Sequence, residues 1–84
     1  MGSLGDIAMT PQTCVMARAG LGLSQSELGE AADVARSTLA DYERQVRVPH
    51  SRTLHDIMRV LVAKGAIFLS DDGNGPGVRL RDVS

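Results

Sequence analysis

The side chains best suited to chemistry in this sequence are arginines that lie close together in its middle. Between positions 36 and 59 three acidic residues stand against five arginines, namely Arg36, Arg44, Arg47, Arg52 and Arg59. The guanidinium group keeps its charge and donates several hydrogen bonds, which suits it to phosphate. Since the whole chain has a formal net charge of −1, the arginines predict a locally positive surface on an otherwise acidic protein. Such a surface favours modest, salt-sensitive binding of nucleic acid.

The sequence lacks the residue combinations that catalysis or metal binding would need. Its single cysteine, Cys14, cannot form an internal disulfide and is expected to be a small buried residue. His50 and His55 have no cysteine partners at metal-ligand spacing, so we expect solvated or phosphate-facing histidines. Asp71 and Asp72 open a glycine-rich turn that no lysine or helix follows, which argues against a phosphate-binding loop. We therefore expect no enzyme, no metal site and no cofactor.

Two short helices joined by a tight turn are predicted to carry the arginines. Ser24 and Glu27 have the S-x-x-E spacing of a capping box at the start of the first helix. Apolar residues then follow at the spacing of one helix face and continue on the second helix: Leu28, Ala31, Ala32, Val34, Leu39 and Tyr42. The other side of the second helix is polar. A short polar helix braced by another helix is what the major groove of DNA accepts.

At these residues the sequence resembles the Cro/repressor-type helix-turn-helix family, also called the XRE family. The resemblance extends over roughly residues 11–64 and rests on Leu23, Ser24, Gln25, Glu27, Leu28, Val34, Thr38, Leu39, Tyr42, Glu43, Pro49, Thr53 and Leu54. It implies a bundle of four or five helices that binds operator DNA, usually as a dimer. Three positions depart from the family pattern: Gly29 replaces an alanine, Asp33 a turn glycine, and Ala35 a capping serine or threonine. A missing cap costs about 1 kcal/mol.

The resemblance implies that the exposed side of the second helix reads bases. Its candidate residues are Arg36, Ser37, Thr38 and Asp41, and the first two lie at the N-terminal end, where base contacts concentrate. Arg36 can bond guanine O6 and N7, and the Thr38 methyl can meet a thymine methyl. Asp41 can accept from a cytosine amino group, or it can pair with Arg44 or Arg36. We favour the intramolecular role for Asp41.

The resemblance also implies phosphate contacts beside that helix. Gln25 begins the supporting helix, where the family uses this residue to bind a backbone phosphate and where the helix N-terminus adds amides and a favourable dipole. Further candidates lie in the loop and at the start of the next helix, namely Arg44, Arg47, His50 and Arg52. The alternative for each arginine is a solvated side chain or a surface ion pair, which would contribute little.

Segments on either side complete a DNA-binding domain that we expect over residues 10–64. Residues 1–9 show no periodic pattern and are expected to be disordered or left over from expression. Thr10 and Pro11 predict a helix start, with the helix running to about Ala19. After the central motif, Ser51 is expected to cap a helix to about Lys64. Its apolar residues would be Leu54, Ile57, Met58, Leu61 and Val62.

Residues 65–84 change character and predict a C-terminal β-hairpin. An apolar run over residues 66–70 is followed by turn-forming residues over 71–77 and then by alternating apolar and basic residues over 78–81. Because an isolated hairpin is marginal in water, its apolar residues need the bundle or a second copy of the chain. We expect edge strands to pair across a two-fold axis, with dimer contacts from Ile67, Phe68, Leu69, Val78 and Leu80.

The expected fold is therefore mainly α, a four- to five-helix repressor-like helix-turn-helix bundle followed by a C-terminal β-hairpin. We expect a sequence-specific transcriptional regulator that binds a palindromic operator in double-stranded DNA as a homodimer. The sequence shows no signal peptide or membrane span, so the cytoplasm is the expected compartment, and the resemblance points to bacteria or phages. The acidic balance, the uncapped Ala35 and the outward Val15 and Met16 keep an alternative open. This alternative is a protein-binding module, such as an antitoxin or an antagonist of another regulator, with a protein partner.

Overall fold

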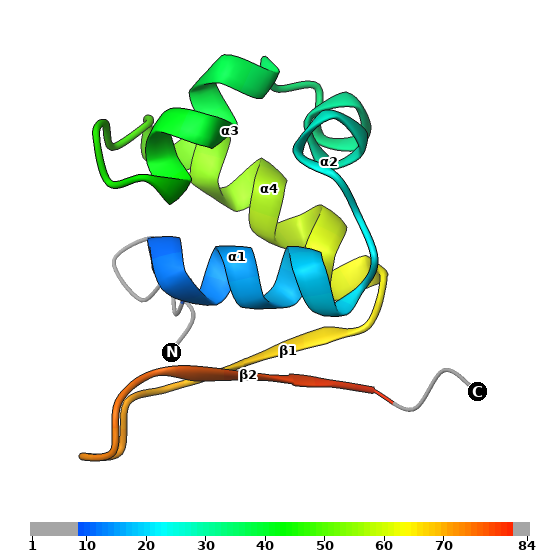
Figure 1. Cartoon of the computed structure of the whole chain (residues 1–84). Coiled ribbons are helices and arrows are strands. Elements are labelled where there is room, and N and C mark those ends of the chain that lie inside the picture. Colours follow the sequence, from blue (N-terminus) through cyan, green and yellow to red (C-terminus); the bar gives the residue numbers. More distant parts are fainter. Residues whose placement is uncertain (1–8, 82–84) are drawn as a thin grey trace.

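Four helices and a two-stranded antiparallel sheet make up the chain over residues 9–81, the part that the structure, a computed structural model, describes. In chain order the elements are α1 (Pro11–Gly20), α2 (Gln25–Ala32), α3 (Arg36–Glu43), α4 (Ser51–Ala63), β1 (Ala66–Leu69) and β2 (Gly77–Leu80). Figure 1 shows α1 and α4 next to the strands, and α3 on the side of the molecule opposite the strands. The predicted fold class, a mainly helical helix-turn-helix bundle with a C-terminal hairpin, is confirmed.

Hydroxyl caps start the first two helices at the positions that the sequence predicts. Thr10 Oγ1 accepts from the Thr13 amide at 3.2 Å, and the Thr10 amide donates to Thr13 Oγ1 at 2.8 Å. At α2 the Ser24 hydroxyl accepts from the Glu27 amide at 3.0 Å, and Glu27 accepts from the Ser24 amide at 2.8 Å. Both capping boxes satisfy amides that a helix start would otherwise leave unpaired.

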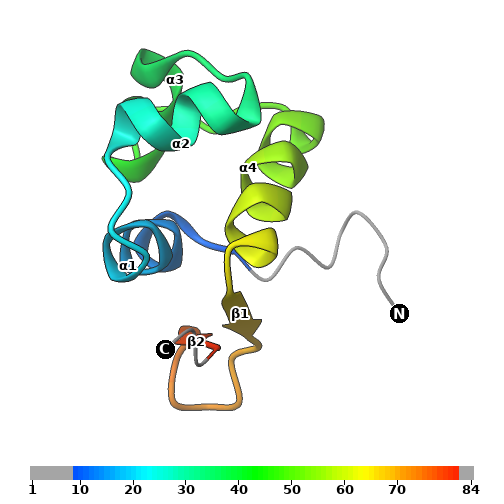
Figure 2. The same ribbon diagram turned by 90° about the vertical axis from the view of Figure 1, so that its right-hand side faces the viewer.

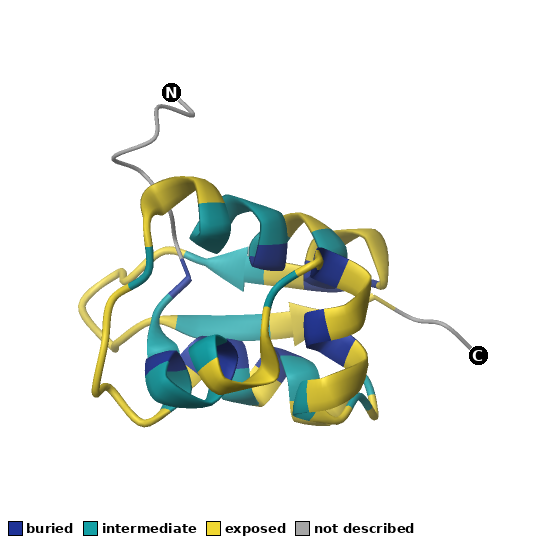
Figure 3. Ribbon diagram, turned by 90° about the horizontal axis from the view of Figure 1, so that it is seen from above, coloured by how far each residue is buried: buried dark blue, intermediate teal, exposed yellow. Residues whose placement is uncertain are grey.

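The core is mainly aliphatic and lies where the four helices meet. Its fully buried side chains include Cys14 from α1, which confirms the expectation of a small buried thiol. The largest others come from α2, α3 and α4, namely Leu28, Leu39, Ile57 and Leu61. Figure 3 shows these buried positions on the sides of the helices that face the middle of the bundle. Met9, the first described residue, is also buried. The rest of the segment expected to be disordered, residues 1–8, lies outside the described part.

Two residues predicted to lie on the buried faces of helices are exposed. Ala31 is exposed, because the buried face of α2 is centred on Leu28, Gly29 and Ala32, and Ala31 lies on the other side of Leu28 around the helix. Val62 is exposed for the same geometric reason, since it falls outside the face of α4 that Ile57 and Leu61 define.

Ser51 does not cap α4. The helix begins one residue earlier than expected, because the His50 carbonyl already accepts from the Leu54 amide at 3.1 Å. His50 is therefore the N-cap residue, and its side chain makes no capping hydrogen bond. Ser51 is the first residue within α4, where its hydroxyl cannot act as the cap.

The predicted hairpin is present, and its two faces differ. In its register Ile67 lies opposite Arg79 and Phe68 opposite Val78. Phe68 and Val78 pack against the helical core, whereas Ile67 on the other face is 37% exposed. Because neighbouring residues of a strand point to opposite faces, Ile67 and Leu69 cannot share a face with Val78. The five apolar residues expected at a dimer contact are therefore divided between the two faces.

Asp71 and Asp72 close the loop between the strands, as expected for turn residues. Asp71 Oδ1 accepts from the amides of Gly73 and Gly75, both at 2.9 Å, and Asp72 Oδ1 accepts from the Asn74 amide at 3.1 Å. Carboxylates that bond amides further along the chain are a common way to stabilise a turn. Both carboxylates thus have a structural role in the loop.

Candidate nucleic-acid interface

The turn between α2 and α3 is tight because two residues allow the backbone to fold back on α2. Asp33 ends α2 in the left-handed conformation, with φ 58° and ψ 46°, which aspartate tolerates better than most residues. The Val34 amide then donates to the Gly29 carbonyl at 2.8 Å. A Cβ atom added at Gly29 would lie 2.6 Å from the Val34 carbonyl oxygen. The close backbone approach therefore explains Gly29, and Asp33 adopts the left-handed conformation for which the family pattern has glycine.

α3 presents its polar side to solvent because its apolar side is held in the core. Leu39 and Tyr42 are buried, whereas Arg36 and Ser37 are exposed and Thr38 is half-buried. Ala35 precedes the helix in an extended conformation and makes no side-chain cap, as the sequence predicts. The helix is thus anchored by its buried side while its N-terminal end is left open.

Asp41 has a partner within the chain. Its Oδ1 accepts from Arg44 Nη2 at 3.2 Å, so the intramolecular pair that we expected is present. The ion pairs within residues 9–81 do not include Arg36, Arg47 or Arg52. These three guanidinium groups remain available to an external anion.

A shallow groove of about 420 Å³ lies between α3 and the start of α4. Its lining combines residues from both helices and from the loop that joins them, namely Thr38, Arg47, Val48, Pro49, His50 and Thr53. The loop is shaped by Gln45, which has a positive φ of 63°, and by the Val46 amide, which donates to the Asp41 carbonyl at 2.8 Å. The fold thereby brings Thr38, expected to read bases, next to Arg47 and His50, expected to bind phosphate.

A buried carboxylate at the end of α3 ties this helix to α1 and α2. The Glu43 side chain is only 4% exposed. Arg18 of α1 donates to both carboxylate oxygens, from Nε at 2.8 Å and from Nη2 at 3.0 Å. Gln25 Nε2 donates at 2.9 Å, and Cys14 Sγ lies 3.6 Å from the carboxylate. The sequence analysis missed Arg18, because it lies 25 residues from Glu43 and no local pattern links the two.

A protein-family model described as helix-turn-helix, of the XRE type, matches residues 16–61, which include α2, the turn, α3 and most of α4. The match covers more than half of the chain. The chain belongs to the XRE-type helix-turn-helix family. The protein is accordingly a DNA-binding helix-turn-helix regulator, and the family is generally non-enzymatic. A search of curated proteins found no match.

In this XRE-type protein the buried network keeps Glu43 ionised. Burial alone would raise the pKa of the Glu43 carboxyl, but hydrogen bonds from Arg18 and Gln25 and the charge of Arg18 hold it below its ordinary value. Burial, followed by the Glu43 charge, raises the pKa of the Cys14 thiol to about 12. Burial likewise raises the pKa of Tyr42 to about 12. Cys14 is thus a neutral thiol near pH 7 and has no reactive thiolate.

Metal ligands and membrane-spanning helices were also expected to be absent from this XRE-type chain, and residues 9–81 bear on both points. No group of three or more His, Cys, Asp or Glu side chains in this part could hold a metal ion. None of its helices has the length and apolar character needed to cross a membrane. His50 is exposed beside the groove, and His55 lies half-buried on α4.

Proposed function

We propose that this chain is a sequence-specific transcriptional regulator that binds a palindromic operator as a homodimer in the bacterial cytoplasm. The observation that carries the proposal is the polar side of α3, which is exposed and braced by α2 through the turn at Asp33. Three arginines outside any ion pair of the described residues surround it, namely Arg36, Arg47 and Arg52. A short exposed helix of this kind enters the major groove, where each base pair presents a distinct pattern of donors and acceptors.

Base reading is assigned to the N-terminal end of α3. Arg36 and Ser37 are exposed there, and Thr38 lies at the edge of the groove. A bidentate bond from Arg36 to guanine is worth about 1–3 kcal/mol of discrimination against other bases. Asp41 is assigned a different role, because its carboxylate already pairs with Arg44. It positions Arg44 beside the DNA backbone and does not read a base itself.

Phosphate binding is assigned to residues on both sides of α3. Gln25 Nε2 has two hydrogens and donates one to Glu43, which leaves the other for a phosphate. The Arg18–Glu43 pair therefore fixes the Gln25 amide group before DNA arrives, and this lowers the entropy that binding must overcome. On the other side of α3, the exposed candidates are Arg44, Arg47, His50 and Arg52.

Selection from a pool of random duplexes at low and moderate salt tests the proposal. We expect the retained sequences to contain a palindrome with half-sites about one helical turn apart. The logarithm of the affinity for that palindrome should fall as the logarithm of the salt concentration rises, with a slope of about 0.9 for each phosphate contact. Arg36→Ala should relax specificity at one position of each half-site, whereas Arg47→Ala should lower affinity for all sequences alike. Retention of no sequence at either salt would contradict the proposal.

Exposed valines beside α3 favour a second candidate, a protein-binding module such as an antitoxin or an antagonist of another regulator. Val46 is 66% exposed and Val48 is 80% exposed, on either side of Arg47. Phosphate binding has no use for two exposed apolar side chains, whereas exposed apolar residues that lie together mark protein contacts. Arg36→Ala separates the candidates, since it should weaken operator binding and relax its specificity in the first and leave partner binding intact in the second.

A further inference from the structure

The hairpin has one face that the helices do not cover. Figures 1 and 2 show α1 and α4 on one side of the two strands, and no helix of the described residues on the other side. Because residues directly opposite one another share a face, the outer face carries the pairs Ile67–Arg79 and Leu69–Gly77. The solvent face of an antiparallel sheet is normally polar. Two apolar residues on this outer face therefore need an explanation.

The apolar part of the outer face lies along β1. Ile67 is 37% exposed, and Leu69 is half-buried although it is not among the residues of the described chain that pack against the core. Leu69 lies over Gly77 instead, since a Cβ atom added at Gly77 would be 3.9 Å from Leu69 Cδ1. Glycine offers no side chain to cover a neighbour, so Ile67 and Leu69 form a flat apolar strip along β1.

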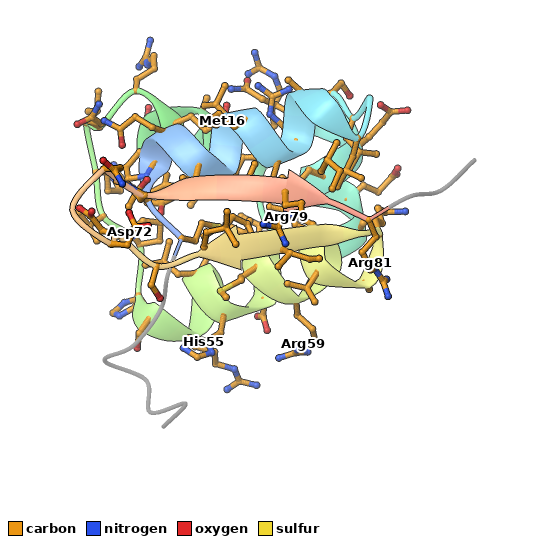
Figure 4. The ribbon with its side chains drawn as sticks, turned by 90° about the horizontal axis from the view of Figure 1, so that it is seen from below. Met16, His55, Arg59, Asp72, Arg79 and Arg81 are labelled. Atoms are coloured by element: carbon orange, nitrogen blue, oxygen red, sulfur yellow. The ribbon has the colours of Figure 1, made fainter. Side chains whose placement is uncertain are left out.

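The charged part of the outer face lies along β2 and just beyond it. Arg79 is opposite Ile67, and the Arg81 amide donates to the Gly65 carbonyl at 2.8 Å, which continues the strand register to Arg81. Both arginines are exposed, and neither belongs to an ion pair within residues 9–81. Figure 4 looks onto this face and shows Arg79 over the strands and Arg81 at the end away from Asp72. The face is thus divided lengthwise into an apolar half and a cationic half.

We propose that this hairpin face, made of Ile67, Leu69, Arg79 and Arg81, binds an amphipathic helix of a partner protein. The apolar side of that helix lies over β1, and its acidic side pairs with the two arginines. The inference goes beyond the proposed regulator, because it adds a protein-binding surface in which α3 has no part. Figure 1 shows α3 on the side of the molecule opposite the strands, so DNA and the partner can be bound together.

A helix suits this site better than a further strand does. In Figure 2 α1 extends beyond β2 and α4 extends beyond β1, so both strand edges lie under helices. Ala66, at the start of β1, is only 2% exposed. Ile67 and Leu69 are two residues apart on one strand, or about 7 Å. Apolar residues four apart on one side of a helix are about 6 Å apart along its axis, which matches that spacing.

The composition of the hairpin face favours an acidic protein over nucleic acid or a second copy of the chain. Phosphate has no use for Ile67 and Leu69, and the carboxylates of Asp71 and Asp72 at the loop end repel it. A second copy stacked on this face would direct the two α3 helices away from one another, so that one duplex could not receive both. An acidic amphipathic helix meets neither obstacle.

Titration of the full chain with designed peptides tests the inference. The probe is a peptide of about 15 residues, with leucine on one side of its helix and glutamate on the other. We expect the peptide to shift the backbone amide NMR signals of the hairpin face and to leave those of α3 unchanged. Peptides with lysine in place of glutamate, or serine in place of leucine, should bind at least about tenfold more weakly.

Charge reversal on β2 supplies the matched test on the protein. Arg79→Glu combined with Arg81→Glu, at two exposed positions, should raise the dissociation constant of the glutamate peptide at least about tenfold and should restore binding of the lysine peptide. The control is Arg36→Glu combined with Arg47→Glu, which reverses the same number of charges at the side of α3. Neither this control nor saturation with the selected duplex should change the affinity for the glutamate peptide.

Four outcomes would overturn the inference: no binding of the glutamate peptide, equal binding of the lysine peptide, competition between peptide and duplex, or weakening confined to the control variant. A wild-type dimer that sedimentation equilibrium shows to dissociate in the Arg79→Glu, Arg81→Glu variant would also overturn it, since a second copy would then occupy the face. Peptide binding by a chain that retains no duplex would contradict only the proposed regulator. Retention of a palindrome without peptide binding would contradict only the hairpin face.

Discussion

The two ends of this molecule are held in place by different kinds of interaction. The end that carries α3 is the one we propose to face DNA, and it is called the DNA-facing end below. There α3 is fixed by directional contacts, since the buried Glu43 bonds Arg18 and Gln25 and the Val34 amide bonds Gly29. At the other end, the hairpin is held mainly by the packing of Phe68 and other half-buried apolar residues on the helices. Directional contacts specify one geometry, whereas apolar packing tolerates adjustment. The comparison indicates that the position of α3 is fixed more strictly than the position of the hairpin.

Removal of the Glu43 carboxylate should have the largest effect, because the DNA-facing end depends on it. Glu43→Ala leaves Arg18, whose side chain is 17% exposed, without its anionic partner. We expect a loss of about 3 kcal/mol in the free energy of unfolding, as for other broken buried pairs. Urea unfolding followed by circular dichroism measures it. The control is Asp56→Ala, which breaks an exposed pair with Arg59 and should cost less than about 0.5 kcal/mol. Equal losses in the two variants would show that the buried network does not hold this end.

Truncation of the hairpin core should have the next largest effect. Phe68 packs on the helical core but is only half-buried, so Phe68→Ala should cost about 2 kcal/mol, below the range for a fully buried phenylalanine. Ile67→Ala, on the opposite sheet face, should cost about 1 kcal/mol or less because much of Ile67 is already in water. Urea unfolding of both variants at one protein concentration would measure these two losses. A larger loss for Ile67→Ala would mean that another molecule covers the outer face.

Acid should weaken the DNA-facing end through Glu43. The folded state holds the pKa of Glu43 below its ordinary value near 4.5, so the unfolded chain binds the proton more readily. This contribution to stability is complete above pH 4.5 and is lost as the pH falls through the lower folded value. Unfolding free energies between neutral and acidic pH should therefore fall less steeply for Glu43→Gln than for wild type. Parallel curves would indicate that other carboxylates govern acid unfolding.

Much of the fold could be predicted from sequence because its determinants are local. The capping boxes at Thr10 and Ser24 depend on residues three apart, and the hairpin depends on a dense run of turn residues. The exposed side of α3 followed from the positions of Leu39 and Tyr42 on one helix face. The errors at Ala31 and Val62 arise because helical spacing alone does not fix the centre of a buried face, and the error at Ser51 arises because a capping residue type does not fix the first residue of a helix.

The features that could not be predicted depend on contacts between distant segments. No spacing rule links Arg18 to Glu43, and Gly29 was counted only as a departure from the family pattern. The close approach of Val34 to Gly29 shows why a side chain would not fit there. The division of Ile67 and Phe68 between two sheet faces also required the observed strand register. The roles of the arginines toward DNA stay predictions, since they concern a partner and not the chain alone.

The smallest expected effect concerns the open start of α3, the part of the DNA-facing end that is not held by directional contacts. Ala35 has φ −60° and ψ 139°, which a capping serine can adopt unchanged, and it is exposed. Ala35→Ser should therefore raise the free energy of unfolding by about 0.5–1 kcal/mol, since its hydroxyl can accept from an amide of the first turn. Ala31→Ser, at an exposed position within α2, is the control and should lower stability by a few tenths of a kcal/mol, about the difference in helix propensity.

The same substitution tests whether that open end takes part in DNA binding. Amides at a helix start bind phosphate well, and a serine cap would occupy one of them. We expect Ala35→Ser to stabilise the protein and yet bind the selected duplex no more tightly than wild type, as measured by titration at one salt concentration. A gain in stability together with a gain in affinity would show that α3 is held too loosely at Ala35 for recognition. The missing cap would then be a weakness of the DNA-facing end, and the open amides would have no part in binding.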